Sequence, residues 1–397
     1  MTFDPSAAST QQAAANCGTP LAAILADRIR QFGPITFAEF MDACLYHPEH
    51  GYYTRPQQGS AADGSEQTRG DFFTSVDVHP VFGRLLARQL AEMWERLERP
   101  AQFTAVECGA GSGALARHIL DFAAKALPQF YPSLRYVAVE RSAARRALQA
   151  ENLAAHVALG NFTTHEALPE RVPAGCIFSN ELLDAFPVHR VVQRSEGLRE
   201  VFVDWKQGKF ADALGEPSTP RLGEYFAEQG ITLLDDAQAE ASLAANDWIA
   251  TVGQALERGY ILTVDYGHDA RELYNEHHAR GTLLAYHQHR ATEDYYARPG
   301  EQDLTAHVNF TALDIAGRRA GLQRLGLVSQ SHFLLALGRA NEFADVYDEG
   351  MSELDRTRAR LHLKTLINPE GMGETFHVLV QAKGVDTAKT LTGLCPL

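Results

Sequence analysis

The feature that most constrains this chain is a strand-like run followed by three alternate glycines, between Phe103 and Gly113. Residues 103–106 are mostly apolar and include a β-branched residue, which is typical of a buried parallel strand. Gly109, Gly111 and Gly113 follow, and residues 114–127 then continue with helical spacing. Because glycine lets the backbone approach a ligand closely, this strand, turn and helix predict a cradle for a nucleotide.

A second apolar strand over residues 136–139 ends in Glu140, about one helix after the glycines. An acid at that place can accept both hydrogen bonds of a ribose diol. A glycine loop alone is a weak signal, but the order of strand, glycines, helix, strand and acid is much stronger. It predicts a cofactor that carries a ribose.

Two cofactors fit such a cradle. Gly109-x-Gly111-x-x-Ala114 matches the fingerprint of dinucleotide-binding proteins, whose loop brings helix N–H groups onto a pyrophosphate. Glu107 argues against an anion, because its carboxylate lies two residues before the first glycine. The sulfonium and ammonium groups of S-adenosylmethionine (SAM) are cationic and would be attracted to that carboxylate. We therefore favour SAM over NAD(P), while a loop that merely turns tightly is a further alternative.

Composition limits the class of protein. The 397 residues are 45% hydrophobic and 22% charged, with a formal net charge of -14, which disfavours a general nucleic-acid binder. The five cysteines have no C-x-x-C spacing and are expected to be reduced thiols. No apolar run approaches the length of a membrane span, and no presequence is expected, which predicts a bacterial cytoplasmic protein.

The element pattern predicts an α/β protein of the Rossmann-like class, with a mostly parallel sheet and helices on both faces. We expect a disordered N-terminus over residues 1–20, a helical extension with a lid over residues 21–80, and the core over residues 81–397. Insertions on the substrate side are expected at about residues 188–258 and 268–310.

Individual elements follow from local patterns. Thr36 and Glu39 have the spacing of a helix-starting capping box, and residues 55–69 have the composition of a lid. Further expectations are a core helix over residues 81–97, a hairpin over 188–205, helices over 236–256 and 352–366, an irregular connection over 281–310, and closing strands over 325–337 and 375–382.

Polar residues follow the next two buried strands. Asn180, Glu181 and Asp184 come after the strand at residues 176–179, and Asp265 comes after the strand at residues 260–264. In an open α/β sheet the ligand lies outside the carboxyl ends of the strands. These side chains are therefore expected to face the cofactor and the substrate.

A tract rich in histidine follows, comprising His268, His277, His278, His287 and His289. Zinc needs three or four convergent ligands. The adjacent His277 and His278 would point in different directions on a helix or strand. We therefore expect a solvated loop here and no metal site.

Eight ordered blocks in the sequence resemble the MidA family of SAM-dependent methyltransferases. They are Gly33-Pro-Ile-Thr-Phe-x-x-Phe-Met41, Gly51-Tyr-Tyr, Gly70-Asp-Phe-Phe-Thr-Ser75, Glu107-x-Gly-x-Gly-x-Gly113, Asn180-Glu181…Asp184-Ala-x-Pro187, Asp265-Tyr-Gly267, Asp303-x-Thr-x-His307 and Met372-Gly-Glu374. The resemblance covers residues 21–384. Asn309 departs from the pattern, since Asp is expected before the Phe. A charged role at that position is therefore not supported.

The resemblance implies a protein arginine methyltransferase, because the mitochondrial members of the family resemble enzymes that modify a subunit of respiratory complex I. Carboxylates are needed to hold a planar guanidinium and to accept its proton. The candidate catalytic residues are Glu181, Asp184, Asp265, Asp303 and His307; the candidate SAM-binding residues are Asp71, Thr74, Ser75, Glu107, Gly109, Gly111, Gly113, Glu140, Asn161 and Asn180.

The expected partners are a protein substrate, for which a respiratory-complex subunit is one candidate, and a second copy of the chain in a homodimer. Neither nucleic acid nor a membrane span is expected. Two alternatives stay open from the sequence, namely a SAM-binding assembly factor with weak or no catalysis and a NAD(P)-dependent oxidoreductase.

Overall fold

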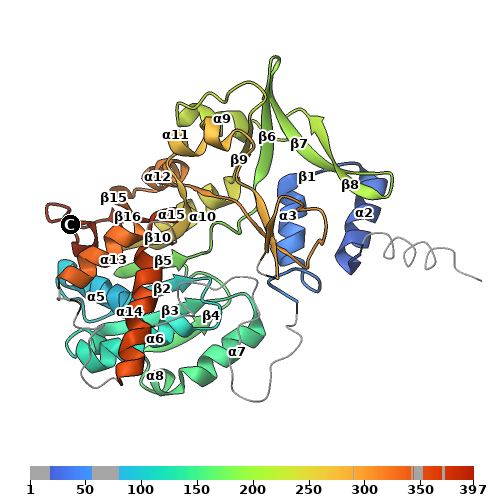
Figure 1. The fold of residues 1–397 in the computed structure, drawn as a ribbon. Helices are drawn as coiled ribbons and strands as arrows, with labels where there is room; N and C mark the ends of the chain where they lie inside the picture. The colour runs from blue at the N-terminus through green and yellow to red at the C-terminus, as the bar shows by residue number, and fades with distance from the viewer. Residues whose placement is uncertain (1–17, 56–79, 289, 341–342, 344–351, 369–371) are drawn as a thin grey trace, which may run out of the picture. The chain divides into compact units, whose positions relative to one another are not determined.

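The computed structural model describes residues 18–55, 80–288, 290–340, 343, 352–368 and 372–397. The chain divides into two compact units, each built from three segments. Unit 1 comprises Met1–Phe72, Asp184–Asn246 and His268–Ala312, and unit 2 comprises Phe73–Leu183, Asp247–Gly267 and Leu313–Leu397. Figure 1 traces the elements of both units. The expected N-terminal disorder and the expected lid fall almost entirely outside the described residues.

Unit 2 contains the sheet that the glycine stretch predicts. Its strands are β2 (Phe103–Cys108), β3 (Leu134–Val139), β4 (Phe162–His165), β5 (Gly175–Asn180), β10 (Gly259–His268), β15 (Gln323–Ser329) and β16 (Phe376–Lys383), and their order is β15-β16-β10-β5-β2-β3-β4. The strands from β10 to β4 are parallel, whereas β16 is antiparallel to both β10 and β15. The predicted mostly parallel α/β sheet is confirmed.

The strand order reverses between β2 and β5. After β2 the chain adds β3 and β4 toward one edge, and it then returns to place β5 on the other side of β2. Cys108 at the end of β2 pairs with Val139 of β3 and Ser179 of β5, so the three strands end close together. Ligands of open α/β sheets bind at such a reversal point, outside the carboxyl ends.

Helices cover both faces of this sheet. They are α5 (Val81–Arg96), α6 (Ala114–Ala126), α7 (Ala143–Asn152), α8 (Ala154–Ala158), α13 (Gln330–Arg339), α14 (Glu353–Ile367), α15 (Met372–Thr375) and the short 3-10 helices η1 (Tyr131–Ser133) and η3 (Thr392–Leu394). Val378 and Val380 of β16 belong to the same core as α5 and α13. Gln381 faces the other way, where Gly317 of α12 (Phe310–Arg319) lies against it.

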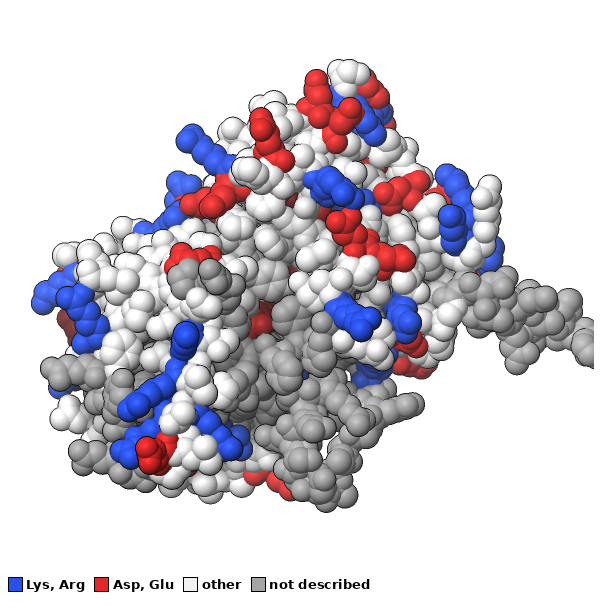
Figure 2. Space-filling model, viewed as in Figure 1, with Lys and Arg blue, Asp and Glu red and all other residues white. Residues whose placement is uncertain are grey.

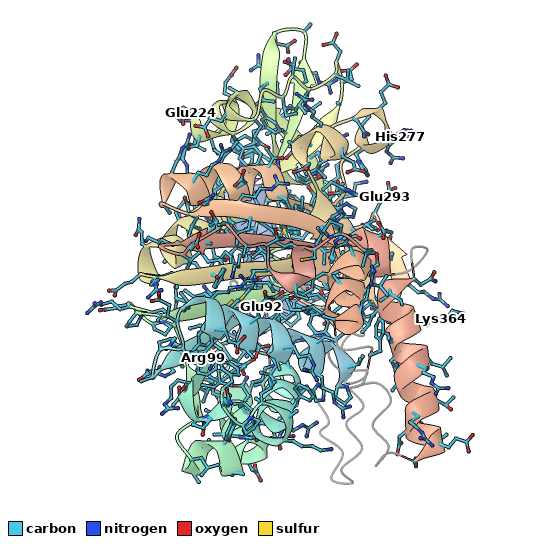
Figure 3. All side chains as sticks on the ribbon, turned by 90° about the vertical axis from the view of Figure 1, so that its left-hand side faces the viewer. Glu92, Arg99, Glu224, His277, Glu293 and Lys364 are labelled. Carbon is cyan, nitrogen blue, oxygen red and sulfur yellow. The ribbon has the colours of Figure 1, made fainter. Side chains whose placement is uncertain are left out.

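The surface of α14 is basic. Ala359 and Leu366 are its buried residues, whereas Arg358, Arg360 and Lys364 are exposed. Figure 2 shows a group of blue side chains over the position of α14, and Lys364 projects outward in Figure 3. No helix in the part of the chain that the structure describes combines the length and hydropathy needed to cross a membrane.

Unit 1 is built on two small antiparallel sheets. The first contains β1 (Ile35–Thr36), β6 (His189–Arg194), β7 (Gly197–Lys206), β8 (Lys209–Gly215) and β9 (Gln238–Ala241), in the order β1-β7-β6-β9 with β8 also on β7. The second sheet has the order β12-β11-β13 and contains β11 (Leu284–His287), β12 (Arg290–Thr292) and β13 (Asp303–Thr305). The next strand along the chain is β14 (Val308–Asn309).

The helices of unit 1 are α2 (Pro20–Phe32), α3 (Phe37–Tyr46), α9 (Arg221–Glu228), α11 (Ala270–Leu273) and the 3-10 helix η2 (Glu276–His278). Two helices, α10 (Leu243–Ala255) and α12, begin in unit 1 and end in unit 2. The predicted capping box is confirmed at the start of α3, because the Glu39 N–H donates to Thr36 Oγ1 and the Thr36 N–H donates to Glu39 Oε2. The predicted hairpin is confirmed as β6 and β7.

Three expectations are wrong in part. The strand expected over residues 325–337 ends at Ser329, whose side chain accepts a hydrogen bond from the His332 N–H and so starts α13. The helix expected over residues 236–256 begins only at Leu243, because β9 pairs with β6 first. The connection expected to be irregular over residues 281–310 contains β11–β14. β9 pairs with residues of β6 that lie much earlier in the chain, and local patterns do not reveal such a partner.

Close strand contact at Gly175 gives a test of the central sheet. A Cβ at this position would overlap the carbonyl oxygen of Thr104 on the neighbouring strand. Gly175→Ala is therefore expected to lower the free energy of unfolding by about 2–4 kcal/mol in a urea titration. Gly223 on α9 has no atom within 4 Å of a built Cβ, so the matched Gly223→Ala variant should gain about 0.5–1 kcal/mol. Equal unfolding curves for the two variants would contradict the described strand spacing.

Candidate functional site

The glycine loop after β2 has the backbone that its sequence predicts. Gly109, Gly111 and Gly113 all have left-handed φ angles, of 77°, 52° and 80°. A side chain is strained in that region, so glycine is the natural residue at each place. The N–H groups of Gly109 and Ala110 donate to the Val139 carbonyl at 3.0 and 3.1 Å. These bonds fix the loop to the end of β3, and α6 begins directly after Gly113.

Glu140 lies beside this loop, at the end of β3. Its Oε2 accepts a hydrogen bond from the Gly111 N–H at 3.0 Å, and its Oε1 accepts one from the Ser142 N–H at 2.8 Å. The side chain is buried. A carboxylate has about four lone-pair positions, so Glu140 keeps acceptor capacity for a ribose diol while it is held in place by the backbone.

Glu107 is a buried carboxyl group on β2. It accepts a hydrogen bond from the Tyr136 hydroxyl at 2.6 Å. Burial raises the pKa of Glu107 to about 8; the Tyr136 hydrogen bond opposes this rise, and the charge of Glu140 adds a smaller increase. A buried cation would remove this penalty, because an opposite charge favours the ionised carboxylate.

The loop fits a ligand of the SAM type. A Cβ built on Gly111 would come within 4.0 Å of Gly109 O alone, so the space above the loop is open. Two acids, Glu107 and Glu140, belong to the strands on which the loop rests. A sulfonium compound with a ribose suits this combination of open backbone, diol acceptor and buried carboxyl better than a pyrophosphate does.

The next strand end holds Asn180 and Glu181. Glu181 has a left-handed φ of 51°, which is unusual for a residue other than glycine. Its N–H donates to the Val264 carbonyl at 2.9 Å, and its Oε1 accepts a hydrogen bond from Asn180 Nδ2 at 3.1 Å. Asn180 is the last residue of β5 and Glu181 follows it directly; β5 is adjacent to β2 in the sheet.

Asp265 shapes this strand end from the neighbouring strand β10. Its side chain is fully buried, and its Oδ2 accepts hydrogen bonds from the N–H groups of Leu182 and Leu183 at 3.1 and 2.8 Å. Its Oδ1 accepts the Tyr266 N–H at 3.0 Å. These hydrogen bonds to backbone groups suit a carboxylate that positions the turn after Glu181.

The other candidate acids lie in unit 1. Asp184 and Asp303 are buried, and the Tyr53 hydroxyl lies 2.9 and 2.8 Å from the two carboxylate oxygens of Asp303. Burial, followed by the charges of Asp303 and Asp184, raises the pKa of Tyr53 well above its usual value. The pKa of Tyr286 is raised by burial and then by the same two acids. Asp184 and Asp303 therefore share one tyrosine-lined acidic cluster.

The remaining candidates have different surroundings. Asn161 Nδ2 donates to the carbonyls of Tyr131 and Leu134, both at 2.9 Å, so the described contacts of this amide lie within the fold. His307 lies with His268 and His278 in unit 1. Asn309, where the family pattern has Asp, accepts the Ala312 N–H and so caps α12. Three candidates, Asp71, Thr74 and Ser75, lie outside the described residues.

Sequence reasoning did not identify the tyrosines as site residues. The pattern of the sequence predicts only that Tyr136 belongs to an apolar strand. In the structure its hydroxyl donates a hydrogen bond to Glu107. Tyr53 belongs to the Gly51-Tyr-Tyr block, and that block was the available signal. Tyr286 has no comparable signal, because its place opposite Asp303 depends on the pairing of β11 with β13.

The sheet order, the glycine loop and the acid at the end of β3 define a SAM-dependent methyltransferase of the Rossmann-like class. This chain belongs to that family, since residues 85–328 match the family profile described as an S-adenosyl-L-methionine-dependent methyltransferase. SAM is accordingly its cofactor, and the dinucleotide alternative is set aside.

Similar proteins cover nearly the whole chain. A Burkholderia thailandensis protein solved with S-adenosyl-homocysteine bound is 32% identical, with a TM-score of 0.82, covering 100% of this chain and 97% of that one. The mitochondrial protein arginine methyltransferase NDUFAF7 of Homo sapiens is 28% identical over 93% of this chain and 85% of its own. The Drosophila melanogaster homolog is 29% identical over 92% of this chain and 85% of its own. The predicted resemblance to the MidA family is confirmed.

Gly111→Val tests the cofactor loop. A branched side chain would stand where the backbone must approach the ligand, so affinity for S-adenosyl-homocysteine should fall at least about 100-fold in calorimetry. Gly160→Val is the matched control, because Gly160 also has a left-handed φ, of 74°, but lies outside the loop, with no atom within 4 Å of a built Cβ. Equal affinity losses in both variants would show that the effect is backbone strain, not contact with the ligand.

The buried carboxyl of Glu107 predicts a pH-dependent stability. Its folded pKa of about 8 lies above the unfolded value of about 4.5, so the folded protein holds an extra proton between these values. Stability is therefore lost as pH rises through this window. Relative to wild type, Glu107→Gln should gain about 2–4 kcal/mol between pH 5 and pH 9.

The measurement is urea unfolding of the cofactor-free protein at several pH values. Glu151→Gln, a change at an exposed position on α7, serves as the control and should follow the wild-type pH profile. A Glu107→Gln protein whose stability tracks wild type across the whole range would contradict the raised pKa.

Proposed function

We propose that this enzyme transfers the methyl group of SAM to a guanidinium nitrogen of arginine in a protein substrate. The observation that carries the proposal is the acidic cluster of unit 1, in which Asp184 and Asp303 are buried among tyrosines. Two carboxylates match the charge and the planar donors of a guanidinium, and tyrosine faces attract cations. Relatives named as protein arginine methyltransferases support the same substrate class.

The cluster is held in position by its own contacts. The Tyr46 ring stacks on the Tyr53 ring with centroids 5.8 Å apart, and the Tyr46 hydroxyl donates to the Ala185 carbonyl at 3.0 Å. The Ala306 N–H donates to the Asp184 carbonyl at 3.0 Å. Because both Asp184 and its neighbour Ala185 are anchored through backbone groups, the Asp184 carboxylate is presented by a fixed main chain.

Methyl transfer is a displacement in which a nitrogen–carbon bond forms as the sulfur–carbon bond breaks. SAM supplies the activated methyl group, and the protein must orient the nitrogen and receive its proton. We assign proton acceptance and orientation to Glu181, and binding of the guanidinium charge to Asp184 and Asp303. Asp265 is a positioning residue, because it holds the Leu182 and Leu183 amides of the turn that carries Glu181.

The cellular setting is part of the proposal. We place the enzyme in a bacterial cytoplasm, which the free thiols of Cys44, Cys108, Cys176 and Cys395 support, since a reducing compartment keeps cysteines unpaired. A respiratory-complex subunit remains our candidate substrate on the strength of the MidA resemblance. A homodimer remains the candidate assembly.

The proposal is tested by incubating the purified enzyme with tritiated SAM and a cell lysate, followed by acid hydrolysis of the labelled protein. Methylated arginine is the expected product. Labelled lysine or a labelled small molecule would overturn the arginine assignment. A protein that binds S-adenosyl-homocysteine but labels nothing would instead be an assembly factor without catalysis.

Glu181→Gln separates catalysis from cofactor binding. The change keeps the side-chain shape but removes the charge that receives the proton, so turnover should fall by about 100-fold or more. Affinity for S-adenosyl-homocysteine should stay within about twofold in calorimetry. Glu196→Gln, in the exposed turn between β6 and β7, is the matched control and should retain wild-type turnover. If affinity and turnover of Glu181→Gln fall together, Glu181 is a cofactor ligand; if neither changes, the proton acceptor is a different residue.

A further inference from the structure

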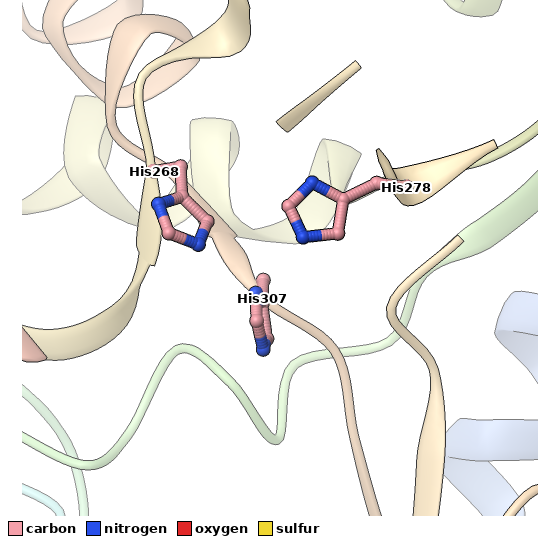
Figure 4. A group of neighbouring side chains, drawn as sticks. All are labelled: His268, His278 and His307. Atoms are coloured by element: carbon pink, nitrogen blue, oxygen red, sulfur yellow. The ribbon is translucent and has the colours of Figure 1, made fainter. Parts of the chain in front are cut away.

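Three histidines that are far apart in the sequence meet in unit 1. His268 ends β10, His278 ends η2, and His307 precedes β14. One ring nitrogen of each lies within 4.8 Å of one nitrogen of both others. Figure 4 shows the three rings around a common space. His307 lies outside the histidine-rich tract of the sequence, yet it joins His268 and His278 in this cluster.

We propose that His268, His278 and His307 bind a divalent transition-metal ion of the zinc type. Three imidazole nitrogens are a common ligand set for zinc, and they leave a fourth position open. Three atoms no more than 4.8 Å apart always have a common point within about 2.8 Å of each, whereas zinc–nitrogen bonds are about 2.0–2.1 Å long. Small inward rotations of the rings therefore complete the site.

Glu272 lies beside two of the ligands. Its backbone carbonyl lies 3.0 Å from Nδ1 of His278, and its carboxylate Oε2 lies 3.5 Å from Nδ1 of His268, at the limit of a hydrogen bond. A metal-bound histidine typically donates its other ring N–H to a carboxylate or a carbonyl. The contact at His278 has this form, and a small movement of the Glu272 side chain would give His268 the same one, with Nε2 of both rings turned toward an ion.

The third ligand is held by a separate chain of contacts. The His307 N–H donates to Thr282 Oγ1 at 3.0 Å, and the N–H and hydroxyl of Thr282 donate to Glu240 Oε2 at 2.9 and 3.1 Å. Glu240 is buried. The backbone at His307 is thus fixed independently of the other two histidines, which is the preorganisation that a metal site requires.

His277 provides a control at the adjacent position. It belongs to the same 3-10 helix as His278, but its side chain is exposed. Figure 3 shows it at the outer surface of the molecule. A variant at His277 changes the local sequence and the histidine content as much as one at His278 does, without touching the three-histidine cluster.

The experiment is calorimetric titration of Zn²⁺ into the full chain, stripped of metal with a chelator and freed of any histidine tag. Wild type should bind one ion with a dissociation constant below about 1 μM, and zinc should raise its melting temperature. His268→Gln and His278→Gln should each weaken binding at least about 100-fold and remove the thermal shift, while His277→Gln should behave as wild type.

Binding of S-adenosyl-homocysteine serves as a folding control for each variant, because Glu107, Gly111 and Glu140 of the proposed cofactor site lie in unit 2. Cobalt gives a second readout, since three imidazoles with an open position produce a visible tetrahedral absorption band that the two cluster variants should lose. Wild type that binds no zinc, or equal zinc binding in His277→Gln and His278→Gln, would overturn the proposal. None of these measurements depends on methyl transfer, so the result is independent of the proposed arginine substrate.

Discussion

The carboxylate of Asp265 is the group on which the strand end that carries Glu181 depends. It is fully buried, yet it accepts hydrogen bonds from two consecutive amides, those of Leu182 and Leu183, and from its own neighbour Tyr266. A buried charge is costly unless it is satisfied in this way. The same bonds stabilise a turn in which Glu181 adopts a left-handed conformation that it would otherwise avoid. The hydrogen bonds to Asp265 thus offset the backbone strain at Glu181, and the same turn amides satisfy the buried carboxylate across two adjacent parallel strands.

The parts of the fold that could be predicted are those whose cause is local. A run of buried residues, glycines at alternate positions and an acid at a fixed distance specify β2, its loop, β3 and Glu140, and each is where the pattern placed it. The capping box of α3 and the β6–β7 hairpin are equally local. Residues 330–337 show the limit of prediction from local patterns. An apolar run that follows Ser329 is compatible with a strand or with a capped helix, and tertiary packing selects the helix.

The site could be predicted only where residues follow strands of the main sheet. Glu107, Glu140, Glu181 and Asp265 all lie at or just after the carboxyl ends of parallel strands, and one rule finds them. His268 also ends β10, but Tyr53, Tyr286, His278 and His307 obey no such rule. They meet through the small antiparallel sheets and irregular segments of unit 1, whose pairing cannot be deduced from periodicity. The adjacent positions of His277 and His278 correctly indicated that their side chains diverge, but could not show that His278 meets histidines from other segments.

The position of β16 in the main sheet has a consequence for synthesis. Gly259–Tyr266 of β10 pair with Phe376–Lys383 of β16, more than 100 residues later in the chain. Until the ribosome has released β16, β10 presents an open row of N–H and C=O groups, which is a template for pairing with another chain. Folding of the methyltransferase sheet is therefore completed late, and a translating polysome carries chains whose central strand is still an edge. A chaperone that shields β10 during this interval would reduce aggregation without changing the stability of the finished protein.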